Sequence, residues 1–253
     1  MREEGHALTG VPSGDGIWQL ELLGAMTARA RTQADVAQLW ILGSARQPDL
    51  MDRWSDIDVG LVLSGAVALS SLLPEGSTVW ALDRQSGDAR STCRVVLDDG
   101  RRLDLIVAAA DEFDRAGGRC VYSDGRAQGE ATATLTLADP PDASANEARF
   151  IAALAVVKYG RGDLLIASHL TLELAQLCLV QAMLLRDRDE GTTSHRFGTR
   201  REGLAAETWS ALHRGNETGA THIQRLVEQF DRLHSELDDR YVPDWSGLVS
   251  LTR

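Results

Sequence analysis

The 253-residue sequence contains few cysteines, and they lie far apart. Its three thiols, Cys93, Cys120 and Cys178, form neither a CxxC pair nor a cluster with histidine. This spacing excludes the common zinc-site patterns and a disulfide framework. We therefore expect reduced thiols and a cytoplasmic protein.

The sequence also lacks long apolar runs and an excess of positive charge. No run approaches the roughly 20 apolar residues that a membrane span needs, and the acidic start of the chain is unlike a signal peptide. Asp and Glu outnumber Lys and Arg by 37 to 26, for a formal net charge of -11. A surface that binds nucleic acid through its phosphates needs clustered basic residues. The composition argues against a nucleic-acid partner or a membrane partner, and it weakly favours a cationic one.

What is present is typical of a soluble globular protein, with 43% hydrophobic and 25% charged residues. Apolar residues at helical spacing predict a helix over residues 17–36. Alternating or short apolar segments predict the strands that follow, and Asp98-Asp99-Gly100 suits a tight turn between the last two. The predicted strands cover residues 38–42, 56–63, 78–82, 92–97 and 101–107.

The second half of the chain has a different pattern, with long apolar-periodic segments typical of a helical bundle. Helices are predicted over residues 144–159, 163–185, 202–213 and 217–237. Asp139-Pro140-Pro141 cannot continue a helix and indicates a junction. The sequence thus predicts an α+β protein, with a mixed-sheet domain at 1–125, a linker at 126–143 and an α-helical bundle domain at 144–253. Both a monomer and a homodimer remain compatible with it.

A strand that ends in Gly43-Ser44 is the first candidate for chemistry. A helix start after such a bend offers backbone N–H groups and a hydroxyl to the phosphates of a nucleotide, and glycine permits close approach. Taken alone, the same residues are more often a strand exit and a helix cap.

Asp56 and Asp58 are the second candidate. Two residues apart on a strand, they share one face while Ile57 enters the core. Paired carboxylates suit a hard divalent cation, and Mg²⁺ is the natural choice for phosphoryl chemistry. Asp104 lies between apolar neighbours on a later predicted strand, where a charge needs a partner. It could complete a three-carboxylate metal site, or it could form a structural ion pair with Arg101 or Arg102.

Gly43-Ser44, followed by Asp56-Ile57-Asp58 and then Asp104, resembles the nucleotidyltransferase superfamily with a DNA polymerase beta-like catalytic core. The resemblance covers roughly residues 38–108 and is greatest to bacterial antibiotic nucleotidyltransferases, notably the aminoglycoside 6-adenylyltransferase group. It implies that Gly43 and Ser44 contact ATP or another nucleoside triphosphate, with Arg46 in the same bend. It also implies that Asp56 and Asp58 bind Mg²⁺ and that Asp104 is the third carboxylate or the base.

The predicted reaction transfers a nucleoside monophosphate, AMP if the donor is ATP, to a hydroxyl of a small and possibly cationic acceptor such as an aminoglycoside. One alternative is a nucleotidyltransferase that acts on RNA or protein, as in toxin and antitoxin pairs. Another is a nucleotide-binding regulatory module without turnover.

Several residues of the helical half could complete the site, although each also has an ordinary structural interpretation. Lys158 could reach a phosphate, as could Arg161, while Asp163 or Glu173 could contact the acceptor. Charges on amphipathic helices usually face solvent, and Asp163 is placed as a helix N-cap.

Aromatic residues and histidines leave similar alternatives. Trp54, in the loop before the aspartates, could stack on the acceptor or the base, whereas Trp40 is expected in the core. His169 is expected to be a packed or hydrogen-bonded core residue and not a catalytic base. His195 and Arg196 could belong to a mobile substrate loop or be simple loop residues.

Overall fold

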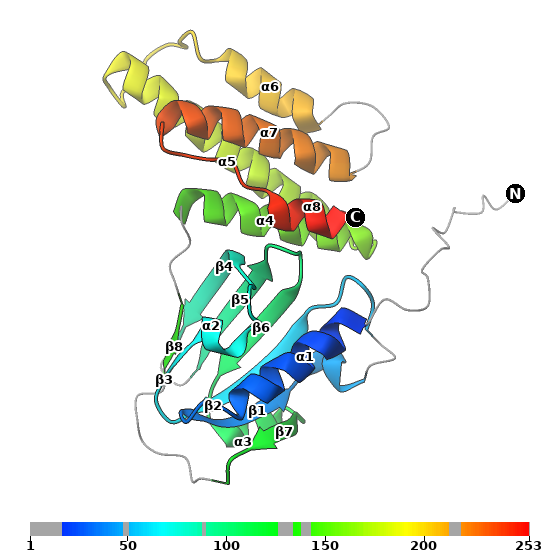
Figure 1. Ribbon diagram of the computed structural model, residues 1–253. Coiled ribbons are helices and arrows are strands. Elements are labelled where there is room, and N and C mark those ends of the chain that lie inside the picture. Colours follow the sequence, from blue (N-terminus) through cyan, green and yellow to red (C-terminus); the bar gives the residue numbers. More distant parts are fainter. Residues whose placement is uncertain are drawn as a thin grey trace, which may run out of the picture. The chain divides into compact units, whose positions relative to one another are not determined.

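The computed structural model describes residues 17–47, 51–87, 90–125, 134–137, 143–212 and 219–252. The chain combines helices with a sheet and divides into two compact units. The first unit comprises Met1–Pro74 with Ile106–Leu135, and the second comprises Glu75–Leu105 with Thr136–Arg253. Figure 1 shows the elements in chain order.

The first unit contains α1 (Ile17–Ala30), β1 (Val36–Ile41), β2 (Ile57–Leu63), α3 (Ala110–Arg115) and β7 (Arg119–Ser123). Strand β1 pairs antiparallel with β2 on one side and with β7 on the other. A short 3₁₀ turn, η1 (Gly43–Arg46), follows β1. Smaller elements complete the unit: β3 (Ala66–Ala68), α2 (Leu69–Leu72) and β8 (Thr134–Thr136), with β3 and β8 pairing as a separate two-stranded sheet.

The alternation predicted for residues 56–63 is observed over residues 56–59, whereas residues 60–63 are all buried. Ile57 and Val59 are fully buried, whereas Asp56 and Asp58 are partly exposed. Gly60 lets β2 approach Phe113 of α3, since a Cβ there would lie 2.8 Å from the phenyl ring. Trp40 packs against the same ring with centroids 6.0 Å apart. This confirms the core position expected for Trp40.

The second unit contains β4 (Val79–Ser86), β5 (Ser91–Leu97) and most of β6 (Arg102–Val107). The strands of the six-stranded sheet follow the order β4-β5-β6-β2-β1-β7. Five helices follow: α4 (Ala143–Gly160), α5 (Leu164–Glu190), α6 (Gly203–Leu212), α7 (Gly219–Leu237) and α8 (Ser246–Thr252). Helix α5 packs against α4, α6 and α7, which gives the predicted helical bundle.

The division into units differs from the expected division into residues 1–125 and 144–253. Asn146 of α4 hydrogen-bonds both the backbone N–H and the carbonyl of Leu82 in β4, each at 2.8 Å. Trp80 of β4 is buried and donates its indole N–H to the carbonyl of Asp244 at 2.9 Å. These contacts group β4 and β5 with the helices. The expected linker, 126–143, lies largely outside the described residues, which include β8 from this stretch.

The helix predicted over 17–36 is shorter, because Val36 and Ala37 belong to β1. Their apolar side chains fit a helical period, but in the structure Val36 pairs with Leu63 of β2. Strand pairing therefore overrides the local pattern. Helices α2, α3 and α8 and the strands β3, β7 and β8 were not expected from the sequence, and the longest of them, α8, has 7 residues.

Helix α5 corrects the expectation about apolar runs. Among the described residues it is the one helix long and apolar enough to cross a membrane, with a mean hydropathy of 1.5 over its best window. The core helix of a helical bundle meets the same criteria when it is mostly buried, but only 33% of this window is buried within the structure. Its packing against three other helices therefore accounts for only part of this apolar composition.

Candidate nucleotide and metal site

The Gly43-Ser44 bend and Asp58 lie together at the end of the β1–β2 pair. Leu42 donates its backbone N–H to the carbonyl of Asp58 at 3.0 Å, which extends the pairing of Ile41 with Val59. A Cβ built on Gly43 would lie 2.0 Å from Oδ2 of Asp58. The Asp58 carboxylate therefore lies directly against the Cα of Gly43, where only glycine leaves room.

Gly43 has a second reason to be glycine, because its φ of +53° is in the left-handed region. The chain then makes a single 3₁₀ turn, closed by the N–H of Gln47 on the carbonyl of Ser44 at 2.9 Å. The helix start expected after Gly43 is thus only four residues long. Any phosphate contact here depends on local N–H groups and the Ser44 hydroxyl, since one turn has little macrodipole.

Arg46 ends the same turn and is anchored across the unit. Its guanidinium donates to the carbonyl of Gly117, in the segment between α3 and β7. The side chain remains exposed. A positive charge is thereby held at the end of the turn that begins with Gly43.

Asp56 immediately precedes β2, and Asp58 lies within it. Both carboxylates are partly exposed, and the Asp58 carboxylate lies against the bend. The prediction that Asp56 shares its face extends the alternation of β2 by one residue. Carboxylate oxygens are the ligand type that Mg²⁺ prefers. Gly43 lets the Asp58 carboxylate lie against the main chain of the bend, so a phosphate held by the N–H groups of the bend would lie near that carboxylate.

Asp104 behaves as expected for its strand but has a partner that the sequence did not indicate. It alternates with the buried Leu103 and Leu105, and Arg94 of β5 lies 3.4 Å from its Oδ2. Arg101, a possible partner suggested by the sequence, pairs with Asp99 at 2.6 Å. Within the described parts of the chain, no three His, Cys, Asp or Glu side chains form a group that could hold a metal ion. The role of Asp104 as third carboxylate stays a prediction.

A turn of four residues precedes Asp56 and carries Trp54 at its tip. The Ser55 hydroxyl donates to Oδ1 of Asp52 at 2.9 Å and accepts the backbone N–H of Asp52 at 3.0 Å. The Arg53 guanidinium lies 4.6 Å from the centroid of the partly buried Trp54 ring. Trp54 therefore has an aromatic face already covered by a cation.

Gln19 of α1 also holds this turn, and it was not among the residues expected from the sequence. Its Nε2 donates to the carbonyls of Asp52 and Ser55, which lie 33 and 36 positions away. The sequence around a buried helical glutamine does not indicate such a role. Only the folded arrangement brings it to the turn.

The predicted residues of the helical half pair with one another. Lys158 lies 3.5 Å from Asp163, which occupies the N-cap position of α5 but makes no side-chain capping hydrogen bond with the described residues. The ε-ammonium group is therefore a closer partner for this carboxylate than the helix N-terminus. Glu173 lies 3.3 Å from His169, whose side chain is 68% exposed. The expectation that His169 is a packed or hydrogen-bonded core residue is wrong, because its side chain is mostly exposed.

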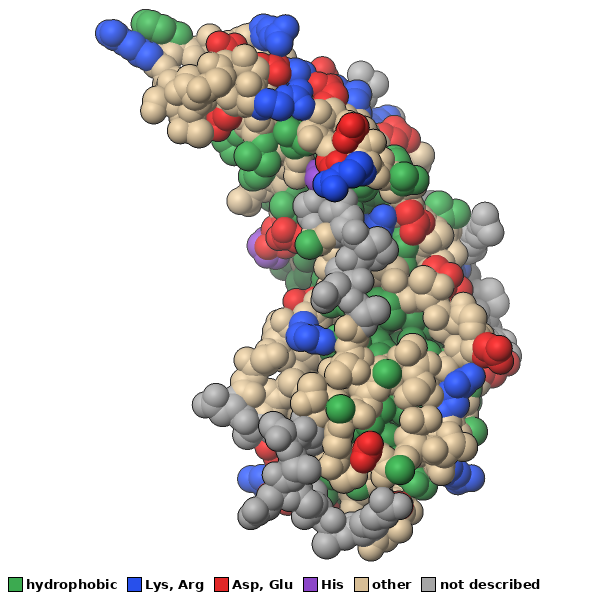
Figure 2. All heavy atoms as spheres, turned by 60° about the vertical axis from the view of Figure 1, so that its left-hand side comes forward, with side chains coloured by type: hydrophobic (Ala, Val, Ile, Leu, Met, Phe, Trp, Pro, Cys, Tyr) green, Lys and Arg blue, Asp and Glu red, His purple; other side chains and the backbone are tan. Residues whose placement is uncertain are grey.

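The segment with His195 and Arg196 is held by charged side chains. His195 lies 2.7 Å from Asp187, and Asp189 pairs with Arg201 at 2.8 Å and Arg200 at 3.0 Å. The hydrogen bond from Arg201 lowers the pKa of Asp189, and the one from His195 lowers the pKa of Asp187. In Figure 2, acidic and basic side chains lie side by side on the upper part of the visible face. This arrangement anchors the loop to the end of α5.

The cysteines are free thiols, in agreement with the sequence. Burial raises the pKa of Cys93 to about 11 and that of Cys178 to about 12. Both are therefore protonated at neutral pH, which makes them poor nucleophiles and metal ligands.

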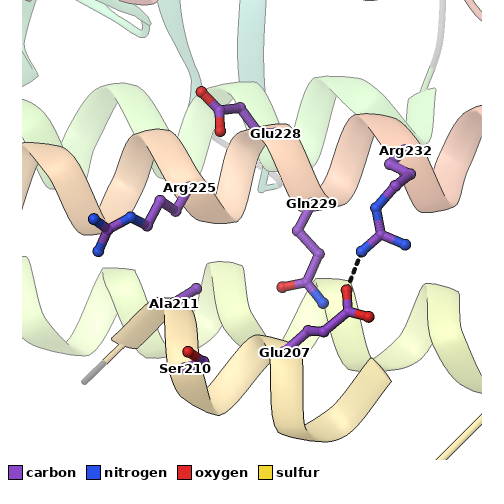
Figure 3. A pocket seen from close by; sticks show the side chains of 7 residues that line it. All are labelled: Glu207, Ser210, Ala211, Arg225, Glu228, Gln229 and Arg232. Atoms are coloured by element: carbon purple, nitrogen blue, oxygen red, sulfur yellow. Dashed lines mark hydrogen bonds and ion pairs between the residues drawn. The ribbon is translucent and has the colours of Figure 1, made fainter. Parts of the chain in front are cut away.

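A separate groove of about 530 Å³ lies between α6 and α7 (Figure 3). An ion pair between Glu207 and Arg232 crosses it. Gln229 is 6% exposed and donates its Nε2 to the Thr208 hydroxyl at 2.8 Å and the Leu204 carbonyl at 3.3 Å. The lining contains none of the candidate residues predicted from the sequence: it is formed by Glu207, Ser210, Ala211, Arg225, Glu228, Gln229 and Arg232.

No protein-family model matches the chain, and no curated protein sequence matches it. Among solved structures, an aminoglycoside 6-adenyltransferase from Bacillus subtilis matches with a TM-score of 0.31 and 12% identity, over 90% of this chain and 94% of that one. A nucleotidyltransferase-like protein from Exiguobacterium sibiricum 255-15 matches with a TM-score of 0.23 and 11% identity, over 92% and 78% of the two chains. TM-scores below 0.5 do not establish a shared fold, so the case for function depends on the residues of this chain.

Proposed function

We propose that this protein is a Mg²⁺-dependent nucleotidyltransferase that transfers a nucleoside monophosphate, AMP from ATP, to a hydroxyl of a small acceptor. The observation that carries the proposal is the contact between the Gly43 bend and the Asp58 carboxylate. This contact brings together the Gly43-Ser44 bend and the paired aspartates, two of the three parts of the sequence motif; the third part is Asp104.

Asp56 and Asp58 would hold Mg²⁺, with Asp104 as the proposed third carboxylate. When bound, the ion neutralises triphosphate charge and polarises the attacking hydroxyl. The carboxylates hold their positions through the backbone: Asp58 through the bond from Leu42, and Asp56 through the turn that ends at Ser55.

The Gly43-Ser44 bend would receive the phosphates. Its backbone N–H groups and the Ser44 hydroxyl are donors for phosphate oxygens, and Gly43 allows the nucleotide to approach the main chain. Arg46, held by the Gly117 carbonyl, adds positive charge where negative charge develops on the leaving group.

In the proposed reaction the acceptor oxygen forms a bond to the α-phosphorus while the bond to the bridging oxygen breaks. Pyrophosphate leaves with that oxygen, and the proton of the hydroxyl passes to a carboxylate of the site. The product is a nucleotidyl ester. The acceleration comes from positioning and from charge complementarity.

For the acceptor we propose a small cationic molecule of the aminoglycoside type. The net charge of -11 favours the approach of a cation. Trp54, two residues before Asp56, would stack on the acceptor with the ring face that Arg53 does not cover, and Asp163 and Glu173 would offer carboxylates for amines. Lys158 is proposed as a further phosphate contact, which would require it to leave Asp163.

Pyrophosphate release from ATP and Mg²⁺ tests the proposal. We expect release to be stimulated by an aminoglycoside and to fall by at least about 100-fold in Asp58→Asn. RNA, protein and lincosamide acceptors serve as comparisons. Release that no acceptor stimulates, or that persists in Asp58→Asn, would contradict the proposal.

A further inference from the structure

Gln19 of α1 is buried beside the turn that leads into Asp56. Its side chain is 1% exposed, and Nε2 donates to the Asp52 carbonyl at 2.8 Å and to the Ser55 carbonyl at 3.2 Å. Ser55 is equally buried. One amide group thus holds both ends of a four-residue turn.

The Ser55 carbonyl belongs to the peptide group that links Ser55 to Asp56. Fixing this carbonyl fixes the plane of the peptide and therefore the direction in which Asp56 leaves the turn. Asp58 needs no such device, because β2 begins at Ile57 and the backbone of Asp58 is bonded to Leu42. Asp56 stands just outside the strand.

The orientation of the Gln19 amide follows from its neighbours. Rotating the amide by 180° would direct Oε1 at two carbonyl oxygens, which repel it. In the observed orientation Oε1 is buried and has no hydrogen-bond partner among the described residues. A buried acceptor without a partner is unfavourable. The two donated bonds are thus the interactions that this side chain provides.

We propose that Gln19 is a positioning residue that holds Asp56 in the geometry needed to bind the divalent ion together with Asp58. This inference rests on the proposed function, because it assigns a purpose to Gln19 only if Asp56 is a metal ligand. Groups that orient metal ligands commonly change metal affinity about 10-fold to 100-fold when they are replaced.

The test is Mn²⁺ binding in the presence of ATP, followed by electron paramagnetic resonance, which requires no turnover. Gln19→Met keeps the length of the side chain and removes both donors. We expect it to weaken Mn²⁺ binding by about 10-fold or more. Asp56→Asn, measured in parallel, should weaken binding at least as much.

Gln229 provides a matched control. It is also a buried helical glutamine whose Nε2 donates to two acceptors, and its Oε1 likewise has no partner among the described residues. Gln229→Met should lower the melting temperature to a similar degree as Gln19→Met. It should leave Mn²⁺ binding unchanged, because α7 carries none of the proposed ligands.

Gln19→Leu is a second variant that keeps the test decisive if Gln19→Met does not fold. It also removes both donated hydrogen bonds, to the carbonyls of Asp52 and Ser55, and should weaken Mn²⁺ binding by about 10-fold or more. Wild-type binding in whichever of the two variants folds would overturn the positioning role, provided that Asp56→Asn has lost affinity. Wild-type binding in Asp56→Asn would overturn the proposed function itself.

Discussion

At the scale of single residues, Gly43 joins a backbone requirement to a site requirement. Its positive φ and its contact with Asp58 both exclude a side chain. A control can separate the backbone effect from the contact with Asp58, because Gly76 also has a positive φ but makes no such contact.

Gly43→Ala should place a methyl group against the Asp58 carboxylate and displace it. We expect a loss of about 1–2 kcal/mol in the free energy of unfolding from the left-handed φ, and a loss of turnover of about 100-fold from the displaced carboxylate. Gly76→Ala is the control, since Gly76 has a φ of +80° and a Cβ there would meet no atom of the described residues within 4 Å. Gly76→Ala should lose stability only through its left-handed φ, and it should keep its turnover. Equal turnover in the two variants would contradict the role of the contact.

Asp104 has two interpretations that separate variants distinguish. If it is the third carboxylate, Asp104→Asn should lower turnover by at least about 100-fold. Arg94→Gln removes only the ion pair, whose members are 43% and 24% exposed, and exposed pairs contribute about 0–1 kcal/mol to stability. Turnover should then stay near wild type in Arg94→Gln. Unchanged turnover in both variants would leave Asp104 as a structural partner of Arg94.

At the scale of elements, the charged groups at the end of α5 predict a pH-dependent anchor for residues 191–201. Because the pKa of Asp189 is lowered below its ordinary value of 3.8, this carboxylate stabilises the fold above that value and loses its effect as the pH falls further. At neutral pH, Asp189→Asn should therefore speed trypsin cleavage after Arg196 and Arg200. Asp111→Asn, which removes an exposed pair with Arg115, is the control. Equal cleavage rates in the two variants would contradict the anchor.

The sequence predicted those elements whose local pattern agrees with their pairing. The Asp56–Leu63 alternation located β2, and the helical periods located α4 to α7 within a few residues. The prediction from sequence failed where a distant pairing partner determines the secondary structure, as at Val36, which pairs with Leu63. For the same reason the ordered motif indicated Gly43 and Asp58, whereas Gln19 and Arg94 carried no signal: their roles depend on contacts between separate elements.

At the scale of the whole molecule, the packing of β4 predicts which fragments fold. Trp80 contacts the ring of Trp245 at 5.9 Å between centroids, and a Cβ on Gly247 would lie 2.5 Å from the Trp80 side chain. A fragment of residues 1–125 lacks these partners and Asn146. We expect it to expose Trp80 and to lack a cooperative unfolding transition, as followed by tryptophan fluorescence. A fragment that unfolds as cooperatively as the full chain would show that residues 75–105 need no helices.

The central claim is that the Gly43 bend and the paired aspartates bind a metal-bound nucleotide. Calorimetric titration of ATP into the full chain, with Mg²⁺ and then with a chelator, tests it most directly. We predict binding that requires Mg²⁺ and that Asp58→Asn weakens by about 10-fold or more. ATP binding that is equal with and without Mg²⁺, or equal in wild type and Asp58→Asn, would contradict the account.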